Sequence, residues 1–420
     1  MKRFFAENLS RLKLYALRIF IASIAYTILF LVFGFKGHLK DPVSFLIMMV
    51  PNLYIGLMGW KYIGARFAIN KKAYWSVYWF ITLSFIPGCI IEKIFGRNIV
   101  SDSLILLDSY WFTTRDYLIP VIIIMLLIKL INKKIGAKPK LFSTTAKYSH
   151  IIGIIFIILI IAYFSYGTWN AFRTVETSYT IDINKKVYGT DGINAVMVSD
   201  LHLGRVFGNE DLKRLVNAIN KSKPDIVFLA GDIIDDENKP FADEHMAETL
   251  HQIESKYGTY AVLGNHDNAA GNREQNLEYL SEAGIKVLVN EYVCVADSFY
   301  VAGRSDRGEM GEQASGRIPL SLLLKDVDKK LPVILLDHQP ADFKEAQQNG
   351  ADIQLSGHTH AGQEIFKMPL ASLYYDFLYG EYRKDNFHAL VSSGFGAWGS
   401  PIRTGSHSEF VNIKIKFNCK

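Results

Sequence analysis

The chain has 420 residues, half of them apolar, and a mean hydropathy of +0.12, which is high for an enzyme that is soluble throughout. Its formal net charge is +5, but residues 1–168 contain 20 Lys and Arg against 6 Asp and Glu, whereas residues 169–420 contain 26 against 35. The basic residues lie between apolar segments and form no stripe with interleaved aromatics, so we expect no nucleic-acid partner. The three cysteines lie far apart and predict neither a disulfide framework nor a zinc–thiolate site.

Five apolar segments in the first part of the chain predict a bundle of about five transmembrane helices. They run approximately over residues 17–35, 43–63, 74–91, 117–131 and 150–166. The first can span about 30 Å of hydrocarbon as a helix and lacks a small-residue cleavage site, which favours a retained helix over a signal peptide. The fourth is the weakest, because Asp108, Arg115 and Asp116 crowd its start.

The short loops between these segments predict an orientation. The N-terminal tail and the loops after the second and fourth segments carry 15 Lys and Arg, whereas the alternate loops carry four. Basic loops stay in the cytoplasm. Five spans therefore predict a multi-pass protein of the plasma or inner membrane, with a cytoplasmic N-terminus and an extracytoplasmic C-terminal half. The side is reversed if the fourth segment does not span.

The second part of the chain alternates between strand and helix patterns. Expected strands lie at 192–199, 225–230, 260–263, 286–296, 298–303, 333–336, 353–355, 389–392 and 409–416, and expected helices at 209–221, 242–255, 273–283 and 340–349. This alternation is typical of a layered α/β domain with loops at the carboxyl ends of the strands. We expect a transmembrane domain over 1–168, a linker with strand character over 169–190, and a layered α/β domain over 191–420.

Five clusters of metal-ligand residues lie in this domain, most of them directly after a strand pattern. They are Asp200-Leu201-His202, Gly231-Asp232, Gly264-Asn265-His266-Asp267, Asp337-His338 and Gly357-His358-Thr359-His360. An acid and an imidazole two residues apart, just past a buried strand, can both turn toward one point. Each cluster alone could be a turn or a buried polar group. Five of them in one α/β domain predict a metal site.

The residue types indicate which metals and which chemistry. Asp, Asn and His without a nearby Cys suit Mn, Fe, Zn or Co. Two such cations about 3.5–4 Å apart can clamp a phosphoryl oxygen and activate a water. The candidate ligands are Asp200, His202, Asp232, Asn265, His338, His358 and His360. His266 is left over and could protonate the leaving group or stabilise charge in the transition state. We expect Asp267 to hold its second ring nitrogen.

Together these motifs resemble the calcineurin-like metallophosphoesterases, over about residues 192–415. The resemblance implies a β-sandwich flanked by helices and makes His266 and a bridging Asp232 the catalytic residues. It assigns Asp200, His202, Asp232 and His360 to one metal, and Asp232, Asn265, His338 and His358 to the other. The stretches 357–363 and 393–396, with Pro401 and Arg403, resemble a branch of membrane-bound phosphoesterases and transmembrane proteins with a metallophosphoesterase domain. Some members of that branch cleave the pyrophosphate of a UDP-linked diacylglucosamine.

The sequence thus predicts a membrane-anchored hydrolase that uses two divalent metal ions, with Mn²⁺ favoured. Its expected substrate is a phosphate ester or pyrophosphate of a phospholipid or lipid-linked headgroup at the surface of the bilayer, because one helix would suffice for tethering alone. One alternative is a tethered phosphodiesterase for soluble nucleotides or phosphodiesters. Another is a sensing module that has lost the chemistry. The oligomeric state stays open.

Several other residues have either a functional or a structural explanation. Arg205, Arg304, Asp306 and Arg403 could line a phosphate pocket or form structural salt bridges. The polar stretch 303–317 could cover the site, and Trp398 could contact lipid or cover the pocket. We expect His245 and His251 on the surface, and His388 and His407 in structural roles.

Overall fold

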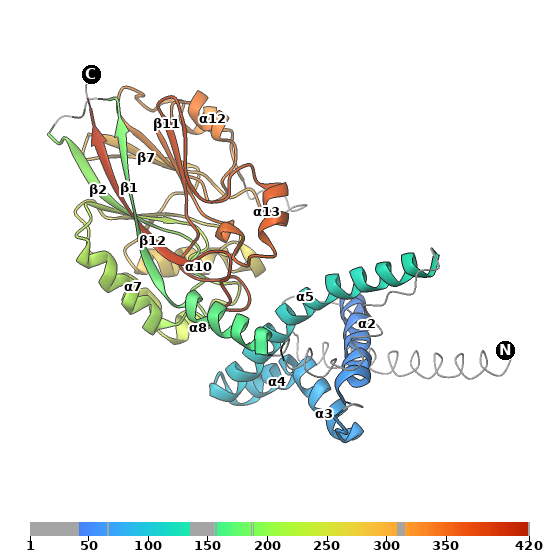
Figure 1. Cartoon of the computed structure of the whole chain (residues 1–420). Helices are drawn as coiled ribbons and strands as arrows, with labels where there is room; N and C mark the ends of the chain where they lie inside the picture. Colours follow the sequence, from blue (N-terminus) through green and yellow to red (C-terminus); the bar gives the residue numbers. More distant parts are fainter. Residues whose placement is uncertain are drawn as a thin grey trace. The chain divides into compact units, whose positions relative to one another are not determined.

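The computed structural model describes residues 42–64, 67–134, 155, 158–185, 187, 189–308 and 316–418 (Figure 1). The chain divides into two compact units, Met1–Leu159 and Ile160–Lys420, and each is described by itself. The apolar segment at 17–35 lies outside the described residues. The segment at 150–166 is described only in part, where residues 158–171 form a helix.

The described part of the first unit is helical. It contains α2 (Pro42–Gly59), a π-helical turn (Trp60–Gly64), α3 (Lys71–Thr82), α4 (Phe85–Phe95) and α5 (Ile99–Lys134). The side chain of Asn70 begins α3 by accepting a hydrogen bond from the backbone N–H of Lys72 at 2.9 Å, which satisfies one of the free donors of the first turn.

The apolar segments do not form the predicted set of single spans in these residues. The segment at 74–91 is divided between α3 and α4, which are bent by 60° to each other, so the single helix expected there is two helices. By length and composition this bent pair could cross a membrane, whereas no single helix among the described residues is both long and apolar enough.

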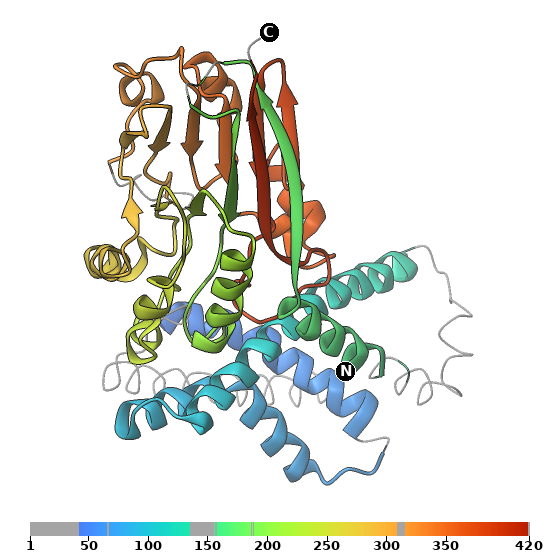
Figure 2. The same ribbon diagram turned by 90° about the vertical axis from the view of Figure 1, so that its left-hand side faces the viewer.

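The second unit is built on two six-stranded sheets (Figure 2). The first has the order β1 (Thr174–Ile183), β12 (Ser408–Phe417), β2 (Gly192–Val198), β3 (Ile226–Ala230), β4 (Thr259–Val262), β5 (Lys286–Val287). The second has the order β10 (Gly380–Lys384), β11 (Phe387–Val391), β9 (Ile353–Ser356), β8 (Val333–Leu336), β7 (Phe299–Gly303), β6 (Glu291–Val295). Strands β2 to β5 are parallel, as are β7, β8, β9 and β11.

The two sheets share an apolar core. Met197 and Phe228 of the first sheet belong to the same buried cluster as Val301, Leu336 and Leu355 of the second. The central strands β3 and β8 are buried at every position. Their uninterrupted apolar sequences are typical of strands that are covered on both faces.

Helices cover the outer faces of both sheets. Helices α7 (Asn209–Lys221), α8 (Lys239–Asp243), α9 (Met246–Leu250) and α10 (Arg273–Glu282) pack on the first sheet, and α11 (Leu320–Leu323) and α12 (Phe343–Gln348) on the second. In α7 the buried residues Leu212, Leu215, Val216 and Ile219 recur with the helical period. The expected α/β layers are confirmed.

Two expectations about local structure are wrong. The helix expected at 242–255 is two short helices, because His245 between them has a left-handed backbone with φ 54°. The run 286–296 is divided between β5 in one sheet and β6 in the other, with Asn290 in a left-handed turn at φ 54°. The strand character expected over 169–190 is confirmed, because β1 lies there and pairs in parallel with β12 along its whole length as a strand of the first sheet. Helix α11, helix α13 (Met368–Tyr374) and strand β10 were not expected.

A buried carboxylate joins β1, β12 and the end of β11. Glu409 accepts hydrogen bonds from Thr177 Oγ1 at 2.6 Å, Ser392 Oγ at 3.0 Å and Ser393 N at 2.8 Å. Burial alone would raise the pKa of Glu409, but hydrogen bonds from His407, Thr177 and the Ser393 backbone hold its pKa at about 2.

We expect Glu409→Gln to lower the free energy of unfolding near neutral pH by about 3 kcal/mol. The folded pKa of about 2 lies below the ordinary 4.5, so the stabilisation is present above pH 4.5 and is lost as the pH falls toward 2. Chemical unfolding of the wild-type chain and the variant in detergent from pH 3 to 7 measures this difference. The matched control is Glu274→Gln, whose side chain is 83% exposed. Equal stability of wild type and Glu409→Gln at pH 7 would contradict the prediction.

Candidate metal centre

The five motif clusters meet at one edge of the sandwich. Asp200, Asp232 and Asn265 follow the carboxyl ends of β2, β3 and β4 in the first sheet, and His338 and His358 follow β8 and β9 in the second. The carboxyl ends of parallel strands share one edge of a sheet, which is where α/β folds place their ligand sites.

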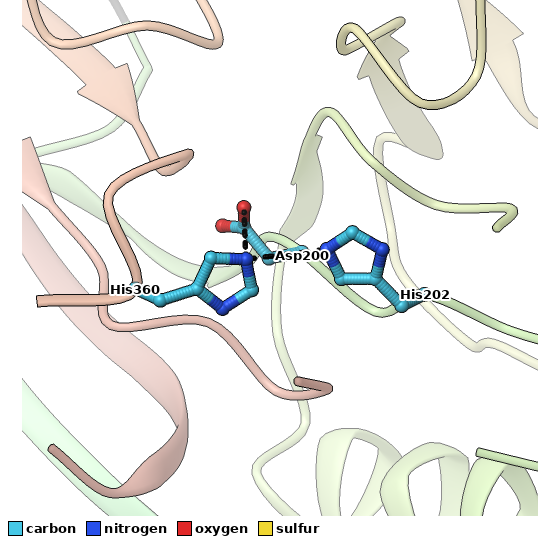
Figure 3. Close-up of side chains that lie close together, drawn as sticks. All are labelled: Asp200, His202 and His360. Atoms are coloured by element: carbon cyan, nitrogen blue, oxygen red, sulfur yellow. Dashed lines mark hydrogen bonds and ion pairs between the residues drawn. The ribbon is translucent and has the colours of Figure 1, made fainter. Parts of the chain in front are cut away.

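One group of candidate ligands consists of Asp200, His202 and His360, whose ligand atoms lie within 4.8 Å of one another. His360 Nε2 lies 3.4 Å from Asp200 Oδ1 and 3.2 Å from His202 Nε2. Figure 3 shows the His360 imidazole directed toward both partners. All three side chains are buried. Two imidazole nitrogens that face each other need a proton or a cation between them.

A second group consists of Asp232, His338 and His358, whose ligand atoms also lie within 4.8 Å of one another. Asn265 joins it, because its Oδ1 lies 2.9 Å from His358 Nδ1. Asp232 Oδ2 lies 3.1 Å from His338 Nε2 and 3.9 Å from His202 Nε2 in the first group. One carboxylate thus lies between the two groups, and the structure brings all seven candidate ligands together.

The backbone is strained at most of these positions. Five non-glycine ligand candidates have left-handed φ angles: Asp200 at 51°, His202 at 45°, Asp232 at 51°, His358 at 69° and His360 at 49°. Such conformations cost on the order of 1–3 kcal/mol each and persist only where the surroundings enforce them. Here the loops hold each other, since Asp200 N donates to Gly231 O at 2.9 Å and His202 N donates to Asp232 O at 3.0 Å.

Two glycines allow the loops to approach this closely. A Cβ at Gly264 would overlap the Asp232 carboxylate, and a Cβ at Gly357 would overlap the Asp200 carboxylate and the Ser199 side chain. The glycines of the Gly-Asn-His-Asp and Gly-His-Thr-His motifs therefore leave room for the acidic side chains beside them.

The charges in the centre are strongly coupled. Burial alone would raise the pKa of Asp232, but the imidazoles of His338 and His266 hold that pKa well below its usual range. Burial alone would lower the pKa of His338, but the Asp232 and Asp200 carboxylates raise that pKa well above its usual value. Burial raises the pKa of Asp200. A buried carboxylate of this kind is stabilised by a cation.

The donor set fits divalent cations. It contains two carboxylates, one amide oxygen and four imidazoles, which are ligands for borderline transition metals. His338 Nε2 is fully enclosed and makes no hydrogen bond within the described part of the chain, although it lies 3.1 Å from Asp232 Oδ2. The two atoms converge at a short distance, as ligands of a common cation do.

His266 lies beside the ligand candidates. Its ring centroid is 4.9 Å from that of His202, its backbone N donates to Asp232 Oδ1 at 2.9 Å, and its Nδ1 lies 2.8 Å from Asp236 Oδ1. Burial alone would lower the pKa of His266, but Asp232 and Asp236 raise that pKa to about 10. The two carboxylates thus favour the protonated form of this imidazole.

The expected partner of His266 is wrong. Asp267 instead accepts backbone hydrogen bonds from Ile233, Ile234 and Gly264, at 3.0, 2.8 and 2.8 Å, and so fixes the loop after β3. The carboxylate on His266 is Asp236, and Asp235 Oδ1 lies 3.5 Å from His202 Nδ1. The acidic pair Asp235-Asp236 follows Asp232 by only a few residues, and this sequence pattern could have indicated both roles.

Of the four polar residues considered for a phosphate pocket, Arg403 contacts the candidate ligand His360. Its guanidinium is fully buried, and Nη2 lies 3.1 Å from His360 Nδ1. Arg205 pairs with Glu237 at 3.0 Å, and Arg304 pairs with Glu345 at 2.9 Å. These two pairs are structural salt bridges.

The remaining residues considered in the sequence analysis are placed as follows. The ring of Trp398 lies 6.2 Å from that of His266, beside the centre. His388 Nδ1 lies 2.7 Å from Glu381 Oε1, and His407 Nε2 lies 3.3 Å from Glu409 Oε2, which confirms structural roles for both. His245 and His251 are exposed, as expected. The middle of the polar stretch 303–317 lies outside the described residues.

Tyr375 is a functional candidate that the sequence did not indicate, because no motif surrounds it. Its hydroxyl lies 2.6 Å from His358 Nε2, and it directly follows α13. The other ring nitrogen of His358 faces Asn265, so Tyr375 fixes which nitrogen is turned to the centre.

We expect Tyr375→Phe to weaken metal binding by about tenfold, because partners that orient a ligand imidazole contribute to affinity on this scale. Titration of metal-depleted protein with Mn²⁺, followed by calorimetry, measures the effect. Tyr374→Phe is the matched control, since Tyr374 is 67% exposed and neighbours Tyr375 in the chain. Unchanged affinity in Tyr375→Phe would show that the hydroxyl does not position His358.

The comparisons with known proteins agree with this geometry. Residues 193–362 match the sequence profile of the calcineurin-like phosphoesterases. A Danio rerio protein, transmembrane protein with metallophosphoesterase domain, is 34% identical over 60% of this chain and 60% of its own length. An uncharacterized metallophosphoesterase of Aquifex aeolicus is 34% identical over 58% of this chain and 92% of its own length. One of Campylobacter jejuni is 27% identical over 92% of this chain and 99% of its own length.

Proposed function

Because the chain belongs to the calcineurin-like metallophosphoesterase family and is a metal-dependent phosphoric ester hydrolase, we propose that it hydrolyses a phosphate ester or pyrophosphate of a lipid or lipid-linked headgroup at a membrane surface. The observation that carries the reaction is the position of Asp232 between the two groups of ligands, 3.1 Å from His338 Nε2 and 3.9 Å from His202 Nε2.

The proposed cofactor is a pair of divalent cations, Mn, Fe, Zn or Co, with Mn²⁺ favoured. Asp200, His202, Asp232 and His360 would hold one cation, and Asp232, Asn265, His338 and His358 the other. When bound, such a pair supplies charge stabilisation for the phosphoryl oxygens and activates the attacking water. Hydrogen bonds between the ligand loops, from Asp200 N to Gly231 O and from His202 N to Asp232 O, keep the donors in place despite their left-handed backbone.

The chain's own proposed contribution to bond cleavage is proton transfer by His266. Asp236 holds Nδ1 at 2.8 Å, so the proton delivered to the leaving oxygen is the one on Nε2. The neighbouring carboxylates favour the charged imidazole, which also stabilises negative charge on the phosphoryl group.

The membrane part of the proposal rests on the first unit. The bent pair α3–α4 could cross a membrane by length and composition. The Danio rerio relative, 34% identical to this chain, is named a transmembrane protein. We place the N-terminus in the cytoplasm and the second unit outside it, because the loops assigned to the cytoplasm carry 15 Lys and Arg against four on the other side.

The test uses the full chain in lipid nanodiscs with Mn²⁺. Release of phosphate or headgroup from lipid phosphates is compared with hydrolysis of soluble nucleotides and of bis(p-nitrophenyl) phosphate. We expect a higher kcat/KM for the lipid substrates. Hydrolysis of soluble nucleotides without hydrolysis of any lipid phosphate would overturn the lipid assignment in favour of a tethered nucleotidase or phosphodiesterase.

A further inference from the structure

Exposed apolar side chains of the second unit gather beside the metal centre. We call Ile365, Phe366, Leu373, Tyr374 and Trp398 the apolar rim. Leu373 is 78% exposed, and Phe366 and Tyr374 are each 67% exposed. Outside this rim and residues 160–172, only Tyr292 and Leu322 are large apolar side chains of comparable exposure among the described residues of the second unit. Clustered exposure of this kind marks an interaction surface.

The rim flanks the centre on two sides. Trp398 lies beside His266, with ring centroids 6.2 Å apart, and Tyr374 directly precedes Tyr375, which contacts His358. Gln363 connects the two sides, because it exchanges two hydrogen bonds of 3.0 Å with the backbone of Trp398. Whatever covers the rim therefore lies next to the reacting groups.

The rim is also bonded to the helix through which the chain enters the second unit. The ring of Tyr163 lies 6.2 Å from that of Phe366, and its hydroxyl lies 2.6 Å from Thr404 Oγ1. The same Thr404 oxygen accepts a hydrogen bond from Ile365 N at 3.3 Å. Arg403 N donates to Gly167 O at 3.0 Å. In both views the helix at 160–171 lies beside the 396–406 loop (Figures 1 and 2).

This helix indicates what covers the apolar rim. It continues the apolar run 150–166, and Ile161 on it is 60% exposed. Tyr163 lies three residues before the end of that run, which is about 5 Å along a helix. A bilayer that contains the run therefore reaches the level of Phe366. Tyr and Trp prefer the interfacial layer, where their rings are buried and their polar atoms are hydrated.

The charges on the rim agree with a lipid surface. Between residues 363 and 375 the only charged side chains are Glu364 and Lys367. They pair with each other, with Lys367 Nζ 2.6 Å from Glu364 Oε1. The segment thus carries no net charge to oppose its entry into the headgroup layer.

We propose that the apolar rim inserts into the interfacial layer of the same bilayer that the run 150–166 enters, so that the metal centre opens onto that surface. The proposal rests on the membrane anchoring proposed above but not on the identity of the substrate. It places His266 and His358 close to the headgroup layer, because apolar side chains at the interface are buried about 5–10 Å into the boundary between headgroups and acyl chains.

A fluorescence experiment tests the insertion without any substrate. The three native cysteines are replaced by Ser in the full chain, and Leu373→Cys is labelled with an environment-sensitive dye. The matched control is Leu322→Cys, at a residue that is 58% exposed on α11. In nanodiscs with nitroxide-labelled lipids, we expect a blue-shifted emission and at least about twofold stronger quenching at 373 than at 322.

Two results of this experiment would overturn the proposal. A dye at 373 that remains as hydrated and as weakly quenched as the dye at 322 would show that the rim stays in water. A blue shift at 373 without quenching by lipid nitroxides would show that protein covers the rim, either another part of this chain or a second copy.

Activity measurements on embedded and soluble substrates distinguish failure of the insertion from failure of the proposed substrate. We expect the triple variant Phe366→Ser, Leu373→Ser, Tyr374→Ser to lose about tenfold in kcat/KM on bilayer-embedded lipid phosphate. It should keep wild-type activity on soluble p-nitrophenyl phosphate, which also shows that it folds, and Leu322→Ser should be unaffected on both. If the dye at 373 is quenched but wild type cleaves no lipid, the substrate assignment fails and the insertion stands. If lipid is cleaved equally by wild type and the triple variant, the insertion fails.

Discussion

Asp232→Asn is expected to lower kcat/KM by at least about 10³-fold on every phosphate-ester substrate, or about 4 kcal/mol of transition-state stabilisation. Asp232 Oδ2 is the only carboxylate oxygen among the described residues that lies close to imidazoles of both ligand groups, at 3.1 Å from His338 Nε2 and 3.9 Å from His202 Nε2. An asparagine amide has the same size but no charge. Its oxygen would bridge two cations poorly, so the protein would hold the proposed pair less firmly.

Metal analysis of the purified variant provides the second readout. We expect two equivalents of Mn²⁺ in the wild-type chain and one or fewer in Asp232→Asn. Asp243→Asn is the matched control, because Asp243 is an exposed carboxylate at the end of α8. Near-normal turnover by Asp232→Asn with two bound metals would show that Asp232 is not the shared ligand.

His266→Gln is expected to lower kcat by about 10²–10⁴-fold on esters with poor leaving groups. The side chain lies beside the ligand candidates, with Nδ1 held at 2.8 Å by Asp236. If His266 protonates the leaving oxygen, hydrolysis of substrates whose leaving alkoxide is strongly basic depends on it most. The leaving group of a p-nitrophenyl ester is the stable p-nitrophenolate anion. The loss of kcat on this ester is therefore expected to be smaller by at least about tenfold.

The leaving-group comparison is decisive for the role of His266. Metal content and KM should stay near the wild-type values, because His266 is not assigned to a cation. His245→Gln is the matched control, since His245 is exposed. An equal loss on alkyl and p-nitrophenyl esters would contradict proton donation and leave only charge stabilisation for His266.

Much of the centre could be predicted because its residues are local in sequence. Asp200, Asp232 and His338 each follow a short strand that ends in an apolar, buried run, and this run itself indicates a buried strand whose end carries the polar group. The α7 pattern gave the bounds Asn209–Lys221 correctly, since its buried stripe has a clear helical period. Both kinds of signal are contained in a few consecutive residues.

The missed features depend on partners distant in the chain or on single backbone angles. Tyr375 reaches His358 only because α13 packs beside the centre, and residues 286–296 are divided between two sheets because β5 pairs with β4 and β6 pairs with β7. The helix expected at 242–255 failed at one residue, His245, where φ of 54° interrupts an otherwise regular pattern. An apolar pattern indicates which face of a helix is buried, but it does not indicate a left-handed φ at a single residue.

The amino-acid sequence by itself determined the reaction class, the seven candidate ligands and His266, because metal chemistry demands particular side chains in recognisable short motifs. Only the tertiary structure decided that Asp236 and not Asp267 holds His266, that Asp232 lies between the two ligand groups, and that exposed apolar side chains flank them. The physical reason is that a hydrogen bond or a shared cation is set by distances of about 3 Å. Such distances join loops from two sheets, and no local pattern of residues encodes them.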